Sequence, residues 1–234
     1  MKVTQLSKAL RDLANPVIAE HSRRFFKTGK GEYGEGDKFL GIRIPILRKQ
    51  AKKYQDITLQ EIQRLLKSSF HEERLCALLL LVRKFTQGDV VERTVIYQLY
   101  LHNTQYINNW DLVDSSAPSI VGVYLENRDN YPLYELAESD SLWERRIAIM
   151  ATFHFIKNNQ FDVTLDLAKQ LISDEEDLIH KAVGWMLREI GKRDLGIEKA
   201  FLKAHYNKMP RTMLRYAIEK FSERERKKYL EGVV

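Results

Sequence analysis

Trp110 and Asp114 are the residues of this chain whose types and spacing could do chemistry. They stand four residues apart in NNWDLVDSSAP, so on a helix they share one face and place an aromatic wall one turn from a carboxylate. A fixed carboxylate can stabilise a developing positive charge, and the face of an indole ring attracts a cation. Asp111 lies about 100° round the same helix and could serve its N-terminal turn instead. A structural interpretation also stays open, with Trp110 as a core aromatic and Asp114 as an ion-pair partner.

The other reactive side chains point to neither a metal centre nor a covalent nucleophile. The six histidines are spread without metal-ligand spacing, and the sequence holds no HExxH motif and no GxSxG elbow. The single cysteine, Cys76, lies in the apolar stretch RLCALLLLV, so we expect a buried small hydrophobe and no internal disulfide. The sequence therefore predicts chemistry without a metal or a cofactor.

Helices must position Trp110 and Asp114, because helix-start signals recur along the chain. The clearest starts are Asn15-Pro16 for a helix toward Lys27, Pro45 for one through Tyr54, and Thr58 with Glu61, which have capping-box spacing. Apolar residues three and four apart predict further helices over 71–85, 89–101, 109–125, 141–156, 161–172 and 174–190. No convincing alternating strand interrupts this series.

One segment, residues 29–41, breaks the helical pattern. It holds five of the eleven glycines and must be a loop. It contains GEGDK, yet no strand precedes it and no Walker GK[ST] follows, which argues against a phosphate-binding P-loop. We expect a connection between helices.

Three of the predicted helices resemble one another and suggest a repeat. Each places charged residues just before a small alanine that begins an apolar stripe, at Ala77, Ala148 and Ala182. Their separations of 71 and 34 residues fit a period of about 35 with one unit skipped, which suits helical hairpins of HEAT or armadillo type. We therefore predict an all-α fold: a single solenoid domain over residues 1–234, a superhelical stack of antiparallel hairpins with a concave basic face.

The positive charge matters only where it clusters. Lys and Arg number 38 against 32 Asp and Glu, a net charge of +6, and only a basic face attracts a polyanion. The patch at residues 224–228 is balanced by neighbouring acids and indicates a solvated helix face. Arg48, Lys49, Lys52 and Lys53 lack such balance, and with the Arg145-Arg146 pair they are the better candidates for phosphate contacts.

Composition excludes several classes of protein. With 234 residues, 44% hydrophobic and 30% charged, disorder is excluded as the main state, and 11 Gly and 5 Pro are too few for a β-sandwich. The longest apolar run, ALLLLV at 77–82, is far shorter than the roughly 20 residues of a membrane span. The N-terminus MKVTQLSKALRD lacks an apolar signal core. We expect a soluble, cytoplasmic protein.

Four sequence motifs of this chain together resemble those of the AlkD family of DNA alkylation repair glycosylases. FLGIRIP at 39–45, WDLVD at 110–114, WERRIAI at 143–149 and KAVGWMLRE at 181–189 carry the resemblance, in family order and with similar spacing. It covers nearly the whole chain, roughly residues 26–193, and the motifs are jointly specific. On these positions the family's active cleft falls at Trp110, Asp114, Arg146 and Trp185, and all four residue types are intact. Arg146 is preferred to Arg145 because it stands three residues after Trp143.

The resemblance implies a monofunctional glycosylase that removes N3- or N7-alkylated purines from duplex DNA in base excision repair. Asp114 would stabilise the sugar cation, Trp110 and Trp185 would offer electron-rich faces, and Arg146 would hold a phosphate beside the lesion. The family is understood to act on a lesion left in or near the base stack, so no base-flipping pocket is expected.

The implied partner is double-stranded DNA containing alkylated bases, bound by a monomeric bacterial protein without cofactor, metal or membrane contact. The basic residues predicted to contact DNA are Arg43, Arg48, Lys49, Lys52, Arg145, Lys181 and Arg188. Two alternatives stay open: a non-catalytic HEAT-repeat DNA-binding protein, and a protein-binding helical scaffold.

Overall fold

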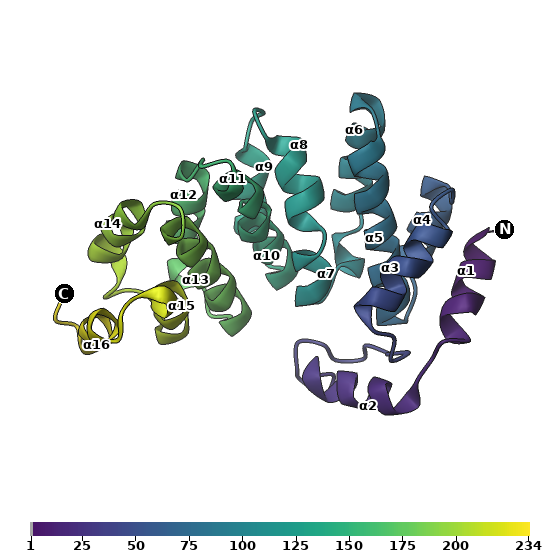
Figure 1. Ribbon diagram of the computed structural model, residues 1–234, viewed down its shortest axis with the longest axis horizontal. Coiled ribbons are helices and arrows are strands. Elements are labelled where there is room, and N and C mark those ends of the chain that lie inside the picture. The colour runs from purple at the N-terminus through teal and green to yellow at the C-terminus, as the bar shows by residue number, and fades with distance from the viewer. Residues whose placement is uncertain (1) are drawn as a thin grey trace. The chain divides into compact units, whose positions relative to one another are not determined.

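The computed structural model describes residues 2–234, and over these residues the protein is helical. The chain divides into two compact units, Met1–Ser116 and Ala117–Val234 (Figure 1). Apart from one parallel bridge between Lys38 and Phe70, the described residues form no β-structure. The all-α prediction is confirmed. The single domain, the hairpin repeat and the basic concave face stay predictions.

The first unit is organised around the long helix α5. Its elements are α1 (Lys2–Arg11), α2 (Pro16–Phe25), α3 (Ile44–Lys53), α4 (Leu59–Leu66), α5 (His71–Gln87), α6 (Val90–Leu101), a 3₁₀ turn (Thr104–Tyr106) and α7 (Trp110–Asp114). Helix α5 packs against α1, α3, α4, α6 and α7. Cys76, in the middle of α5, is fully buried, and burial raises the pKa of its thiol to about 12, as expected of an inert cysteine.

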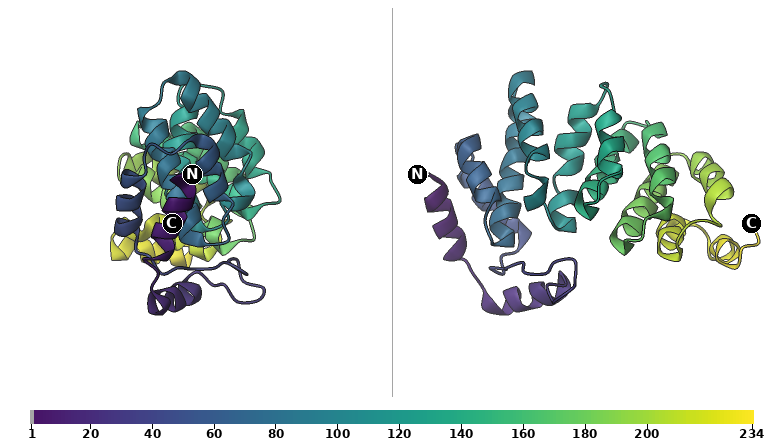
Figure 2. Two further views of the ribbon diagram at one scale, coloured as in Figure 1. Left: turned by 90° about the vertical axis from the view of Figure 1, so that its right-hand side faces the viewer. Right: turned by 180° about the vertical axis from the view of Figure 1, so that it is seen from behind.

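Helix α2 and the loop after it lie across the ends of the other helices of the first unit, as Figure 2 shows from two further sides. The predicted cap is present: Oδ1 of Asn15 accepts the N–H groups of Val17 and Ile18, both at 3.1 Å. The predicted capping box of Thr58 and Glu61 is also present at the start of α4. The segment 29–41 is a loop of successive turns, as predicted.

The second unit is organised around α13. Its helices are α8 (Val123–Leu125), α9 (Tyr131–Ala137), α10 (Leu142–Ala151), α11 (Phe153–Lys157), α12 (Asp162–Gln170), α13 (Asp177–Gly191), α14 (Leu195–His205), α15 (Arg211–Ala217) and α16 (Glu223–Glu231). A π-helical turn (Pro118–Gly122) and two 3₁₀ turns (Leu171–Ser173, Ile218–Lys220) complete it. Helix α13 packs against α10, α14 and α15.

Two predicted helices are divided in the structure. The segment 109–125 contains α7, then the π turn that begins at Pro118, then α8. Proline has no N–H to donate, and the π turn shifts the hydrogen-bond register there. The segment 141–156 divides at Thr152, whose hydroxyl donates to the C=O of Ile149 at 2.7 Å. Apolar periodicity runs through both breaks and does not reveal them.

Candidate active site

Helix α7 carries Trp110 and Asp114 on the face that is not packed into the core. Asn109, fully buried, caps the helix by accepting the N–H of Trp110 at 2.9 Å. Leu112 and Val113 are fully buried, whereas Trp110 and Asp114 are half-buried. The short helix therefore holds both side chains at the surface of the first unit.

Trp110 belongs to an aromatic cluster with the end of α2. Its ring stacks on Phe26 with centroids 5.3 Å apart, and Phe25 meets it edge-on at 5.9 Å. Phe26 also stacks on Phe39, at 5.1 Å. Since Trp110 is half-buried, part of its indole remains accessible beside these supporting rings.

Asp114 lies in the electrostatic field of a buried phenol. Tyr100 is fully buried, and its hydroxyl is 2.9 Å from that of Ser116. Burial raises the pKa of Tyr100, and the charge of Asp114 raises it further. A neutral hydroxyl group and a carboxylate thus lie near one another at the end of α7.

Asp111, on the other side of α7, bonds to a histidine that sequence reasoning did not single out. Its Oδ2 is 2.8 Å from Nε2 of His71, whose Nδ1 is 2.9 Å from Oδ2 of Asp37. Arg74 donates to Oδ1 of Asp37 at 2.8 Å. Burial alone would lower the pKa of His71, but the two carboxylates outweigh it and raise the pKa to about 9. No spacing rule connects these residues, so the sequence carried no signal for the network.

A cavity of about 400 Å³ borders this network between α2, α3 and α5. Phe26, Phe39, His71 and Asp111 are among its lining residues. Its walls are mainly apolar, and its polar lining residues are Ser22, Arg43, His71, Glu72 and Asp111.

The FLGIRIP motif has a structural explanation in this unit. The buried Glu72 carboxylate accepts three N–H groups of the motif, from Leu40 (2.8 Å), Gly41 (2.7 Å) and Ile42 (3.2 Å). Gly41 has φ +81°, and a Cβ there would lie 2.2 Å from the C=O oxygen of Asn15, so only glycine fits. The motif therefore ties the loop to α5.

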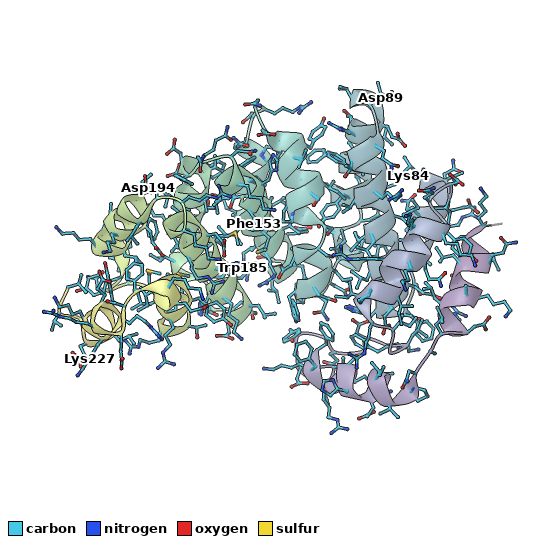
Figure 3. All side chains as sticks on the ribbon, viewed as in Figure 1. Lys84, Asp89, Phe153, Trp185, Asp194 and Lys227 are labelled. Carbon is cyan, nitrogen blue, oxygen red and sulfur yellow. The ribbon has the colours of Figure 1, made fainter. Side chains whose placement is uncertain are left out.

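The second unit holds Arg146 on α10 and Trp185 on α13. Arg146 is 4% exposed, and its Nη1 donates to the C=O of Leu178 near the start of α13. Trp185 is half-buried; its Nε1 donates to Glu189 at 3.0 Å and its ring lies 5.9 Å from that of Phe153, its neighbour in Figure 3. Arg145 pairs with Asp174 at 2.6 Å. Both arginines thus make contacts inside the second unit.

The structure brings Trp110 and Asp114 together on α7 and places Arg146 and Trp185 on two packed helices of the other unit. A cleft that contains all four residues is a proposal.

The predicted DNA contacts fall into two groups. Arg43, Arg48, Lys49 and Lys52, at or in α3, are exposed, and no acid pairs with them among residues 2–234. Arg48, Lys52 and Arg83 border a hollow of about 360 Å³. In the second unit, Lys181 pairs with Asp177 at 2.7 Å and Arg188 with Glu219. The α3 group therefore has the more available charge.

Within residues 2–234, no group of three or more His, Cys, Asp or Glu side chains could hold a metal ion. None of the helices described is both long and apolar enough to cross a membrane.

The sequence matches the family model of the DNA alkylation repair enzyme over residues 6–221. Its structure is similar to a predicted DNA alkylation repair enzyme from Enterococcus faecalis, with a TM-score of 0.70 and 18% identity over 90% of this chain and 97% of that one. The protein smu.31 from Streptococcus mutans gives a TM-score of 0.54 and 15% identity over 95% of this chain and 100% of that one. At such identities the likeness shows the fold alone, and a comparison with curated proteins finds no match. Because the family model spans most of its length, the chain belongs to the DNA alkylation repair enzyme family.

Proposed function

We propose that the protein is a DNA glycosylase that hydrolyses the N-glycosidic bond of purines alkylated at N3 or N7 in duplex DNA. The observation that carries the proposal is the Trp110 and Asp114 pair on one face of α7, in a chain of the DNA alkylation repair enzyme family. The enzyme would act without a cofactor and as a monomer.

The substrate supplies much of the driving force. A purine alkylated at N3 or N7 carries a positive charge, so it is a good leaving group and needs little help from a general acid. As the bond breaks, positive charge builds on the deoxyribose. Asp114 would stabilise that charge and orient or deprotonate the attacking water, which is the role of carboxylates in glycoside hydrolysis.

The other three residues would stabilise the cationic sugar or base and position the DNA. Trp110 and Trp185 offer electron-rich faces to the cationic sugar or base, each worth roughly 0.5 to 2 kcal/mol. Arg146 would contact a phosphate beside the lesion, and its bond to the C=O of Leu178 holds the guanidinium against α13 before DNA binds.

DNA would lie along a basic face of stacked helical hairpins, with the exposed cations of α3 among its phosphate contacts. We propose that the lesion stays in or near the base stack during release, as the AlkD resemblance implies.

Base release from methylated duplex DNA tests the proposal. The wild type should release 7-methylguanine or 3-methyladenine under single-turnover conditions, and Asp114→Asn should abolish release while duplex binding persists. Asp56→Asn, at an exposed acid of the same unit, is the matched control and should behave as wild type. Full activity of Asp114→Asn would overturn the assignment. A wild-type protein that binds duplex DNA and releases no base would be a non-catalytic DNA-binding protein.

A further inference from the structure

His71 lies between two carboxylates and bonds to both, through Nδ1 to Asp37 and through Nε2 to Asp111. An ionised carboxylate only accepts, so both ring nitrogens must donate, and only the imidazolium carries two N–H groups. A neutral ring would turn a lone pair toward one of the carboxylates. The geometry therefore requires a charged His71.

This one side chain joins three segments of the first unit. Asp37 belongs to the loop 29–41, His71 is the first residue of α5, and Asp111 is the second residue of α7. The backbone supports the same join, because the N–H of His71 donates to the C=O of Lys38 at 2.8 Å. The glycine-rich loop thereby acquires a role: it carries Asp37 to the start of α5.

The contacts of His71 bear directly on α7. Asp111 follows Trp110 and precedes Asp114 by three residues, so its bond to His71 fixes the rotation of the helix about its axis. Phe26 lies against both His71 (5.0 Å) and Trp110 (5.3 Å) and supports the two rings together. Oδ1 of Asp111 is buried with no hydrogen-bond partner in the described part of the chain. Asp111 therefore depends on His71, and without that donor it would turn toward water.

We propose that the Asp37–His71–Asp111 chain is the positioning device of α7: the bridging imidazolium holds Trp110 and Asp114 in the orientation that base release needs, and loss of its proton frees the helix. This inference rests on the proposed glycosylase function. The three members are positioning residues, since none is assigned a contact with DNA.

Two of the other charged groups around His71, Arg74 and Glu72, have hydrogen-bond partners of their own. From α5, Arg74 bonds to Asp37 and, with His71, holds the pKa of that carboxyl below its usual range although burial would raise it. Glu72, next to His71, accepts backbone N–H groups of the loop. From the start of α3, Arg43 lines the same cavity as His71 and Asp111. His71, with its pKa near 9, is therefore the group of this cluster whose charge changes in mildly alkaline solution.

The pH dependence of single-turnover 7-methylguanine release, with spontaneous release subtracted, tests the inference. The wild-type rate constant should be level near neutral pH and fall as the pH passes about 9. In Asp37→Asn the amide oxygen still accepts from Nδ1 but the charge is gone. The pH at which the rate constant falls should then be lower by about one unit or more. The rate constant near pH 6 should be at most about threefold below that of the wild type. The affinity for unmodified duplex should stay within about twofold.

His102→Asn is the matched control, because His102 is an exposed histidine of the same unit and should leave the profile unchanged. A rate constant that falls at the same pH in Asp37→Asn as in the wild type, or equal losses of rate and DNA affinity, would overturn the inference.

The titration of His71 can also be followed without activity, from its ring-nitrogen NMR resonances. A pKa near 9 that falls in Asp37→Asn supports the bridge, whereas an ordinary value of about 6.5 in both proteins overturns it. If the wild type releases no base at any pH while His71 titrates as expected, the glycosylase function and the positioning role fail, and the bridge alone stands.

Discussion

The two carboxylates of α7 have different surroundings, which suits them to different roles. Asp111 bonds to His71 and belongs to the hydrogen-bonded interior. Asp114 shares a face with Trp110 and lies near the buried hydroxyl of Tyr100. Environment, more than residue type, separates two acids three positions apart. This is why Asp114, and not Asp111, is proposed to face the sugar cation.

Trp110→Ala should lower the single-turnover rate of base release about tenfold, since a cation–π contact of roughly 0.5 to 2 kcal/mol corresponds to a factor of about 2 to 30. Trp110→Phe keeps a ring against Phe26 and should recover most of the loss. Trp143→Phe, at a half-buried tryptophan of the other unit that is not assigned to the site, serves as the control. Equal rates for wild type and Trp110→Ala would remove the indole from the mechanism.

The free energy of unfolding should fall as the pH rises from about 6.5 to 9. The folded protein keeps a proton on His71 with a pKa near 9, whereas the unfolded chain releases it near 6.5, so the stabilisation is complete below the lower value and lost through the upper one. The loss should be on the order of 2 kcal/mol in urea titrations. His71→Gln should show a smaller pH dependence and His102→Gln the wild-type one. If the free energy of unfolding depended on pH equally in His71→Gln and in the wild type, His71 would be excluded as the source of this dependence.

At the scale of elements, helix starts were predictable where a side chain caps them. Asn15 and Thr58 accept N–H groups at the positions that their sequence context predicts. The breaks near Pro118 and at Thr152 were not predictable from periodicity, because the apolar spacing continues through them. Local chemistry sets where a helix begins, and tertiary packing decides how far it runs.

The same distinction applies to the candidate site. Trp110 and Asp114 could be predicted because both lie on one short helix. The bridge of His71 could not, since its partners are 34 and 40 residues away and meet it only after the loop and α7 have packed on α5. Glu72 is similar: it is buried and holds the backbone of the FLGIRIP motif, whose residues precede it by 30 to 32 positions.

Gly184→Ala tests the packing of α13 on α15. In an exposed helix this change gains up to about 1 kcal/mol. Here a Cβ would lie 2.3 Å from the C=O oxygen of Met213 and 2.6 Å from the Cβ of Tyr216, so the helices must move apart. We expect a loss of about 2 to 3 kcal/mol in thermal or urea denaturation. Gly196→Ala in α14, where the nearest atom is the Asp194 side chain at 3.2 Å, should be neutral or stabilising. Similar stabilities for the two variants would show that α13 and α15 are not so close.

At the scale of the whole molecule, the net charge of +6 is less informative than its pairing. Several cations of the second unit, among them Arg145, Lys181 and Arg188, are paired with acids of that unit. The cations of α3 are exposed. A phosphate that binds a paired cation must first compete with its carboxylate, so the unpaired group should contribute more to DNA affinity.

The triple variant Arg48→Ala, Lys49→Ala, Lys52→Ala should therefore weaken the binding of duplex DNA and reduce its dependence on salt. Each lost phosphate contact lowers the slope of log K against log salt by about 0.9, so three contacts would lower it by nearly 3. Because phosphate contacts carry no sequence or lesion information, alkylated and unmodified duplexes should lose affinity equally, while the rate of base release at saturating enzyme stays within about threefold. Lys227→Ala with Lys228→Ala is the matched control: both residues are exposed cations of α16, and Lys227 is paired with Glu231. A slope that changes equally in the two variants would mean that DNA senses the total charge and not the face that α3 presents.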